Sequence, residues 1–233
     1  MRAPRPVSTP GRNRRLGGLR WVRRLGQLYL GLVLYGVSAA MQVQAGLGLD
    51  PWDVLHQGLA VVLDHRIGTV SIAVGALVLL LWIPLRQWPG LGTVSNVLVV
   101  GLAMNATLAV LPEQHGNPAR ISTLAAAVLL CGVATGMYIT AGFGPGPRDG
   151  LMTGIARRTP LSIRLSRTLV EVTVLVTGWL LGGTVGVGTV LFAVAIGPLA
   201  QLFLRLFARL GLDSSNLTHA APQDTDVTAP ALP

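Results

Sequence analysis

Two aspartates stand at corresponding points of a duplicated segment, and they are the first candidates for chemistry. The segment AGLGLDPWDVLHQGLA, starting at Ala45, returns as AGFGPGPRDGLMTGIA, starting at Ala141. Both copies keep one aspartate, Asp53 in the first and Asp149 in the second. Ionisable groups at membrane depth are costly and usually functional. The two carboxylates are therefore candidates to bind a proton, a cation or a solute, while the structural alternative is that each caps a short helix.

The residues beside the aspartates have two interpretations as well. Both copies carry glycines at the same two places: Gly46, Gly48, Gly142 and Gly144. Glycine permits a sharp turn into a helix, but successive glycine N–H groups also cradle anions. Arg148 could offset the charge of Asp149 at such an anion site. Its structural alternatives are a cytosolic anchor or a local pair with Asp149.

Three further polar residues are candidates. Glu171 lies well inside a predicted apolar span, four residues after Arg167, so the two can pair on one helical face, or Glu171 can titrate in a transport cycle. Asn96 could line a polar seam between the two copies, although polar residues also serve close helix packing. His56 follows Asp53 by three residues, but two ligands make a weak metal site, and a polar helix surface is the preferred interpretation.

These residues belong to a duplicated half-protein. Sliding residues 25–104 onto 121–200 gives 23 identities in 80 positions, and GLGTV at Gly90 returns as GVGTV at Gly186 with the same offset of 96. This period is too long for a solenoid unit. In an apolar chain it favours an internal repeat embedded in a membrane.

The composition places the chain in a lipid environment. It is 51% hydrophobic and 12% charged, whereas soluble domains carry about 25% charged residues. Backbone hydrogen bonding in a bilayer favours helix, so we expect an all-α membrane protein. Six segments are long enough to span: 25–45, 69–86, 93–111, 121–141, 165–184 and 188–207.

Two shorter helices complete the pattern, at about 52–63 and 148–158. Asp50 and Pro51 form a helix start, with the aspartate as N-cap and the proline at the first helical position. A helix of this length reaches only about 17 Å and cannot cross a core of about 30 Å. We therefore expect re-entrant or interfacial half-helices.

Each copy then holds three crossings, and since three is odd, the second copy enters the membrane in the opposite sense. The sequence thus predicts two inverted three-span repeats. All 18 basic residues are arginines, and with a cytosolic N-terminus 16 of them face the cytosol, as the positive-inside rule requires. An eight-span arrangement gives the same tally, so helix length decides between the two. The expected boundaries are a disordered tail 1–20, repeats 21–111 and 121–211, a loop 112–120 and a disordered tail 212–233.

Several function classes are disfavoured. No phosphate loop, nucleophile elbow or zinc signature occurs, so we expect neither an enzyme nor a cofactor. The net charge of +9 does not indicate nucleic-acid binding, since the arginines gather in the first 24 residues and beside apolar spans. Cleavage of the first span as a signal peptide is disfavoured because that span aligns with an internal one. Cys131 is expected to be a small core residue.

The paired motifs resemble a known family. The Gly46 to Asp53 and Gly142 to Gly150 segments, with Gly90–Val94 and Gly186–Val190, are similar to the signature of the YczE/YyaS/YitT family of bacterial integral membrane proteins. The resemblance covers about residues 25–207 and implies a membrane location. It carries over no catalytic residue.

The leading hypothesis is a secondary transporter of a small solute or ion in the bacterial cytoplasmic membrane, with both termini in the cytosol. Its site would lie between the repeats, and Asp53, Asp149 and Glu171 are the residues expected to act in coupling or recognition. The alternative is a membrane scaffold or accessory protein that regulates partners without moving solute. The lipid bilayer is the expected environment, and a homo-oligomer stays open.

Overall fold

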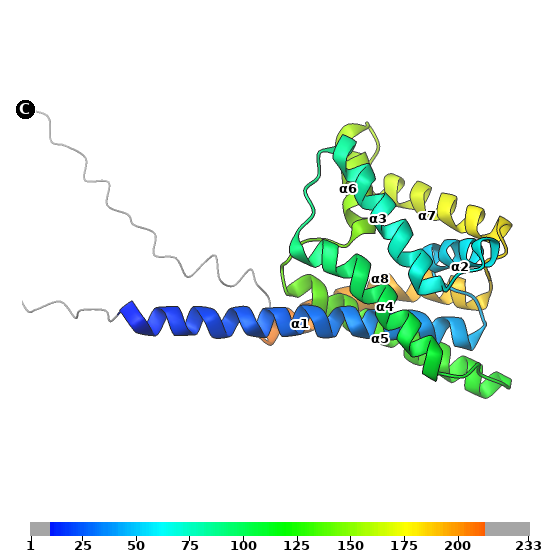
Figure 1. Ribbon diagram of the computed structural model, residues 1–233, viewed down its shortest axis with the longest axis horizontal. Coiled ribbons are helices and arrows are strands. Elements are labelled where there is room, and N and C mark those ends of the chain that lie inside the picture. The colour runs from blue at the N-terminus through cyan, green and yellow to red at the C-terminus, as the bar shows by residue number, and fades with distance from the viewer. Residues whose placement is uncertain (1–9, 213–233) are drawn as a thin grey trace, which may run out of the picture.

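A computed structural model describes residues 10–212, with side chains from residue 20 onward. Within this range the chain forms eight α-helices and no strand (Figure 1). In chain order the helices are α1 Pro10–Ala45, α2 Pro51–Leu63, α3 Ile67–Leu85, α4 Leu91–Val110, α5 Asn117–Thr140, α6 Pro147–Arg158, α7 Ile163–Leu180 and α8 Val187–Arg209. Helix α1 takes in residues 10–20, which the composition assigns to a tail, while 1–9 and 213–233 lie outside the described residues.

The duplication in sequence is also a duplication of helices. Helices α2, α3 and α4 begin 96 residues before α6, α7 and α8 respectively, which is the offset of the sequence repeat. The two expected short helices are present as α2, with 13 residues, and α6, with 12. Both begin with proline at the first helical turn, but their caps differ. The Asp50 carboxylate accepts hydrogen bonds from the backbone N–H groups of Trp52 and Asp53, as expected of an N-cap, whereas Gly146 provides no side-chain cap for α6.

The two halves are tied together by contacts that occur twice with the roles exchanged. The backbone N–H of Gly188 donates to the carbonyl of Leu47 at 2.7 Å, and that of Gly92 donates to the carbonyl of Phe143 at 2.8 Å. Gly92 and Gly188 hold the same place in the repeat, as do Leu47 and Phe143. The turn that follows the first helix of each half is therefore fixed to the start of the last helix of the other.

A pair of arginines repeats this exchange at the helix ends. Arg24 Nε donates to the carbonyl of Ala141 at 2.9 Å, and Arg120 Nε donates to the carbonyl of Ala45 at 2.8 Å. Basic side chains are favourable at helix C-termini, where carbonyls lack partners. Helices α1 and α5 lie side by side, and each has its last turn capped by an arginine of the other. From the sequence these arginines are read only as topology signals.

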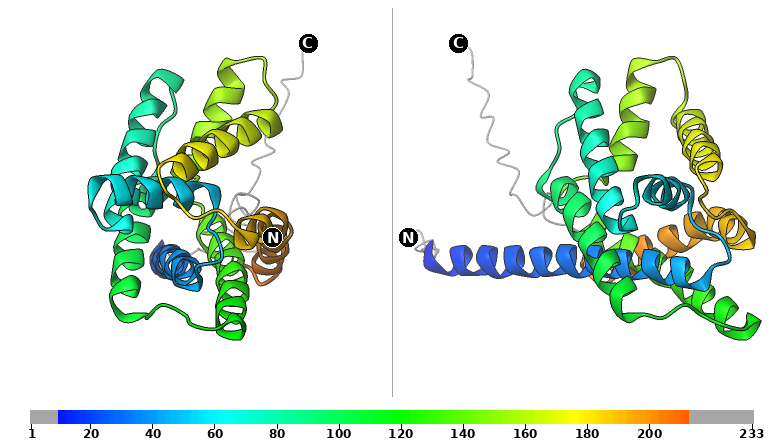
Figure 2. Two further views of the ribbon diagram at one scale, coloured as in Figure 1. Left: turned by 90° about the vertical axis from the view of Figure 1, so that its right-hand side faces the viewer. Right: turned by 45° about the vertical axis from the view of Figure 1, so that its right-hand side comes forward.

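The short helix of each half packs against the third helix of the other half: α2 on α7, and α6 on α3 (Figure 2). In both interfaces the two helices approach each other closely at a glycine. The glycine belongs to the third helix in one interface and to the short helix in the other. In the first, Gly178 of α7 lies against Val54, and a Cβ at residue 178 would stand 2.5 Å from the Val54 carbonyl carbon. In the second, Gly150 of α6 lies against the buried Trp82 ring. In the repeat, Gly178 is equivalent to Trp82 and Gly150 is equivalent to Val54. The large and the small residue of the interface have therefore exchanged helices.

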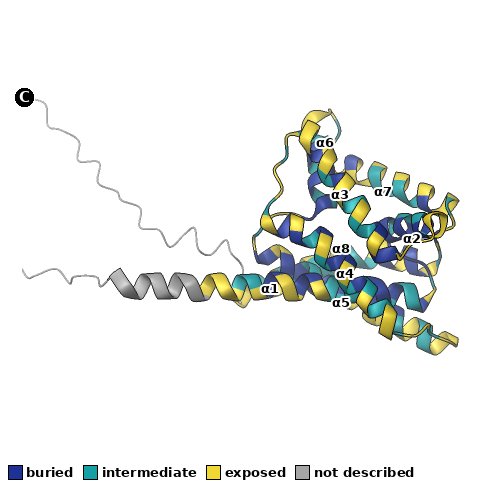
Figure 3. Cartoon of the chain, viewed as in Figure 1, coloured by how far each residue is buried: buried dark blue, intermediate teal, exposed yellow. Residues whose placement is uncertain are grey.

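Five helices are long and apolar enough to cross a membrane: α1 over Arg20–Ala45, α3, α4, α5 and α8. The outer faces of the helices are exposed rather than buried (Figure 3). In α8 only 17% of the apolar window is buried inside the protein. An apolar helix that leaves most of its surface uncovered is typical of a lipid-facing span.

The expectation of six spans is met at five of them. The segment expected at 165–184 forms α7, which is absent from the five because of its charges. Arg164, Arg167 and Glu171 all lie in its first half. The expectation of a span here rests on the length of the apolar segment and does not weigh these three charges.

The α2–α7 interface gives a stability prediction. Gly178→Ala should lower the free energy of unfolding by about 1–3 kcal/mol, because the added methyl group meets the backbone of α2 and forces the two helices apart. Denaturant unfolding of the purified protein in detergent measures the loss. Gly26→Ala is the matched control, because residue 26 is an exposed helix position with no atom within 4 Å of an added Cβ, and helix propensity there favours alanine by about 0.5–1 kcal/mol. Equal stability of the two variants would contradict the close approach.

Candidate functional site

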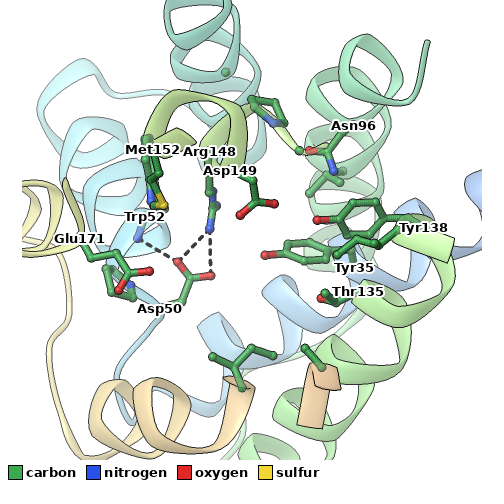
Figure 4. Close-up of a pocket in the computed structure, with 18 of the residues that line it drawn as sticks. Tyr35, Asp50, Trp52, Asn96, Thr135, Tyr138, Arg148, Asp149, Met152 and Glu171 are labelled. Atoms are coloured by element: carbon green, nitrogen blue, oxygen red, sulfur yellow. Dashed lines mark hydrogen bonds and ion pairs between the residues drawn. The ribbon is translucent and has the colours of Figure 1, made fainter. Parts of the chain in front are cut away.

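A cavity of about 340 Å³ lies at the centre of the helices, and all eight contribute to its wall (Figure 4). The polar part of the wall comes from both halves. It is formed by the ends of the short helices and by side chains that face them: Tyr35, Asp50, His56, Asn96, Thr135, Tyr138, Arg148, Asp149, Arg167 and Glu171. The rest of the wall is mainly valine, isoleucine and aromatic carbon. The cavity therefore has a mixed wall, in which the charged groups stand at the starts of α2 and α6 and on α7.

The central charged contact joins the two short helices. Arg148 of α6 reaches across to α2, with Nη1 3.3 Å from Asp50 Oδ1 and Nη2 3.6 Å from Asp53 Oδ1. Both carboxylates are 2% exposed. A buried carboxylate is costly without a partner, and two of them here share one guanidinium. The expectation that Arg148 acts as an anchor or pairs with Asp149 was wrong, because its nearest charges belong to the other half.

Arg148 also marks the place where the halves meet. Its guanidinium carbon lies 5.2 Å from the centre of the Trp52 ring, within the range of a cation–π contact. Trp52 and Arg148 occupy the same position in the two copies. Residues at equivalent positions of two related halves can touch each other only near the axis that relates the halves. The guanidinium therefore stands near the middle of the duplicated structure.

His56 adds a second partner for Asp53. Its Nδ1 lies 2.9 Å from Asp53 Oδ1, one turn away on α2, and the imidazole is only 3% exposed. A polar helix surface was the preferred interpretation of His56, and it was wrong because α2 is enclosed by neighbouring helices on this side. Met152 holds the same place in the second copy, so Asp149 has no equivalent partner.

The surroundings shift the pKa of each aspartate at these helix starts. Burial raises the pKa of Asp50, and the nearby charge of Asp53 raises it further. Burial also acts to raise the pKa of Asp53, but the hydrogen bond from His56 and the charge of Arg148 outweigh it, so this pKa lies below its usual value. Burial raises the pKa of Asp149. The pKa of Asp53 is thus shifted in the direction opposite to those of Asp50 and Asp149.

Most of the candidate side chains expected from the sequence lie in this wall. Asn96, Arg148, Asp149 and Glu171 line the cavity, and Asp53 stands directly behind it, bonded to His56. The expected pair between Arg167 and Glu171 is present, with Nε 2.8 Å from Oε1. The Glu171 side chain is 33% exposed and stands at the middle of α7, where it lines the cavity.

The four glycines serve the turns and do not line the cavity. Their φ angles are 62°, 112°, 71° and 113° for Gly46, Gly48, Gly142 and Gly144 in that order. These values lie in the left-handed region, where side chains are disfavoured. A Cβ at Gly48 would also meet the start of α8, and one at Gly144 would meet Thr93 at the start of α4. The turn interpretation of the glycines fits this geometry.

Sequence reasoning missed several polar contributors to the wall, among them Asp50, Tyr35 and Tyr138. Asp50 was assigned only as a helix cap, and Tyr35 and Tyr138 were not singled out because they lie inside apolar helices. Their rings meet edge to face with centroids 6.2 Å apart. One signal was available: tyrosines are scarce here, at three in the chain, and all three fall in the first helices of the two halves, Tyr29 and Tyr35 in α1 and Tyr138 in α5.

The geometry describes an all-helical, internally duplicated membrane protein with a charged central cavity. The chain belongs to a family of unknown function, DUF6198, whose model matches residues 22–205. It is 42% identical over 183 residues to an uncharacterized protein of Haemophilus influenzae, covering 78% of this chain and 84% of the relative.

Two relatives from Bacillus subtilis extend this picture. The uncharacterized membrane protein YczE is 32% identical over 187 residues, covering 80% of this chain and 86% of the relative. The uncharacterized protein YyaS is 26% identical over 184 residues, covering 77% and 92%. The expected resemblance to the YczE and YyaS group is confirmed, and with it the membrane-integral location. No solved structure matches the chain.

The shared guanidinium gives a prediction for stability. Arg148→Met should cost about 3–5 kcal/mol of unfolding free energy, because it leaves two buried carboxylates without a cation. Arg167→Met is the matched control: its pair with Glu171 is largely exposed, and such pairs are worth about 0–1 kcal/mol. Denaturant unfolding in detergent compares the two. If both variants lose the same small amount, Arg148 does not hold the halves together.

Proposed function

We propose that the protein is a secondary transporter for a small solute and that the central cavity is its substrate site. The observation that carries the proposal is the position of Arg148, Asp50 and Asp53: a charged cluster from both halves, enclosed at the centre of an apolar molecule. Charges in such surroundings are expensive, and transporters place them at the junction of their repeats, where substrate and coupling ions bind. A purely structural junction could be built from apolar residues at lower cost.

The proposal includes an inverted arrangement of the halves. It is supported by the exchanged contacts, Gly188 with Leu47 and Gly92 with Phe143, since contacts that swap partners in this way are those of a two-fold relation. In the proposed arrangement this axis lies in the membrane plane, α7 completes the second half as a sixth crossing, and α2 and α6 enter from opposite sides as half-helices. The polar wall and the Arg167–Glu171 pair then give α7 a water-facing or protein-facing side.

Access to the cavity would alternate if two groups of helices, each with elements of both halves, rock against each other. The close packing of α2 on α7 and of α6 on α3 would make these four helices the first unit. Helices α1 and α5, capped by Arg24 and Arg120, would form the second unit. Movement between these two units opens the cavity to one side or the other without breaking the backbone contacts inside either.

Sidedness labelling tests the inverted arrangement. In a Cys131→Ser background, His115→Cys and Thr159→Cys each place one thiol at an exposed residue in the loops after α4 and α6. In intact cells a membrane-impermeant maleimide should label residue 115 and leave residue 159 unlabelled until the cells are opened. Labelling of both positions from the outside would exclude the arrangement.

Alternating access separates a transporter from a scaffold. Asn96→Cys in the same background puts a thiol in the cavity wall. We expect this thiol to react from outside in intact cells and from inside in inverted vesicles, with both rates changing when substrate is present. A scaffold that regulates partners would leave residue 96 unreactive, or reactive from one side at a fixed rate, and would give no solute flux in proteoliposomes.

A further inference from the structure

The charges around the cavity do not balance. Three carboxylates of its wall, Asp50, Asp149 and Glu171, face two arginines, Arg148 and Arg167. Glu171 is taken by Arg167 at 2.8 Å. Arg148 is shared by Asp50 and by Asp53 behind it. In the part of the chain that the structure describes, this leaves Asp149 without an ion pair.

Asp149 differs from Asp53, its equivalent in the first copy. Asp53 is almost fully enclosed and receives His56 and Arg148. Asp149 is half-buried, and no hydrogen bond to its carboxylate is recorded from the backbone of α6. In Figure 4 its carboxylate faces the same space as the hydroxyls of Tyr35 and Tyr138. The first aspartate therefore stabilises the junction of the halves, and the second presents to the cavity a carboxyl group that has no ion-pair partner among the described residues.

The rest of the wall suits an organic body. Aromatic rings of Tyr35, Tyr138 and Trp52 stand around the charged end, and valines of α3 and α4 continue the wall. Aromatic faces attract cations, and apolar walls favour carbon. The cavity, at about 340 Å³, exceeds the space of a single metal ion. In residues 20–212 no group of three or more His, Cys, Asp or Glu is placed to hold a metal.

We propose that the cavity takes a small organic cation, a protonated amine with an apolar body, and that Asp149 is the counter-ion of its ammonium group. The aromatic wall surrounds the ammonium, and the valine-lined part of the cavity receives the hydrocarbon. An anionic solute is disfavoured because both arginines of the wall are already paired, Arg148 with Asp50 and Asp53, and Arg167 with Glu171. This inference names the substrate class of the proposed transporter, so it rests on the proposed function.

Three probes of equal shape test the charge preference: benzylamine, benzyl alcohol and benzoate. Binding to the purified protein in detergent at neutral pH is measured by isothermal titration calorimetry. Benzylamine should bind at least about tenfold more tightly than benzyl alcohol, because only the amine forms a charge-assisted contact with the carboxylate, and benzoate should not bind. Tighter binding of benzoate or of the alcohol, or no binding of the amine, overturns the proposal.

The role of Asp149 is tested by substitution. Asp149→Asn should weaken benzylamine binding at least about tenfold and leave binding of the alcohol unchanged, while Asp149→Glu should keep part of the preference for the amine. Glu113→Gln is the control, because residue 113 is an exposed carboxylate in the loop between α4 and α5. Amine binding by a folded Asp149→Asn variant at the wild-type level overturns the assignment. If that variant does not fold, the preference of the wild-type protein among the three probes decides alone.

Flux separates this inference from the proposed function. Proteoliposomes loaded with benzylamine report whether a bound amine is also moved. Benzylamine binding without flux would contradict the proposed transporter and support the amine site. Flux of another solute, with no amine binding, would support the proposed transporter and contradict the amine site.

Discussion

The structure depends on one guanidinium shared across the junction of the two halves. Among the described residues, Arg148 is the one arginine that contacts the buried carboxylates of Asp50 and Asp53, and the His56 imidazole also contacts Asp53. Removing charges from water costs several kcal/mol per ion, so neither the arginine nor the two carboxylates would be retained here separately. Their pairing fixes where α6 stands relative to α2, and the position of the cavity follows from that.

The backbone contacts around this junction explain how a chain with little polar sequence holds a specific arrangement. Lipid offers no hydrophobic force to press helices together, so close packing and hydrogen bonds must do it. Glycines supply both: Gly92 and Gly188 bring N–H groups to the opposite half, and Gly36 and Gly132 let α4 and α8 approach α1 and α5. The same positions are therefore small in both copies for one physical reason.

The sequence was informative where one residue and its neighbours determine the structure. Asp50 and Pro51 predicted the start of α2, and the spacing of Arg167 and Glu171 predicted their contact, because both are local effects within one or two helical turns. The partner of Arg148 and the burial of His56 could not be predicted. Both depend on which surfaces of α2 and α6 come together, and periodicity does not contain that information. The sixth expected span, α7, is not among the five helices apolar enough to cross a membrane, because three charged residues lie in its first half.

Large and small residues have exchanged places between two contacts, Val54 with Gly178 and Trp82 with Gly150. This exchange has a consequence for the history of the chain. A tandem of two first halves would place a valine at residue 150 against the indole of Trp82, where there is no room even for a methyl group. A tandem of two second halves would oppose glycine to glycine and leave a void. The halves have therefore become complementary parts, and neither could rebuild the molecule by pairing with a copy of itself.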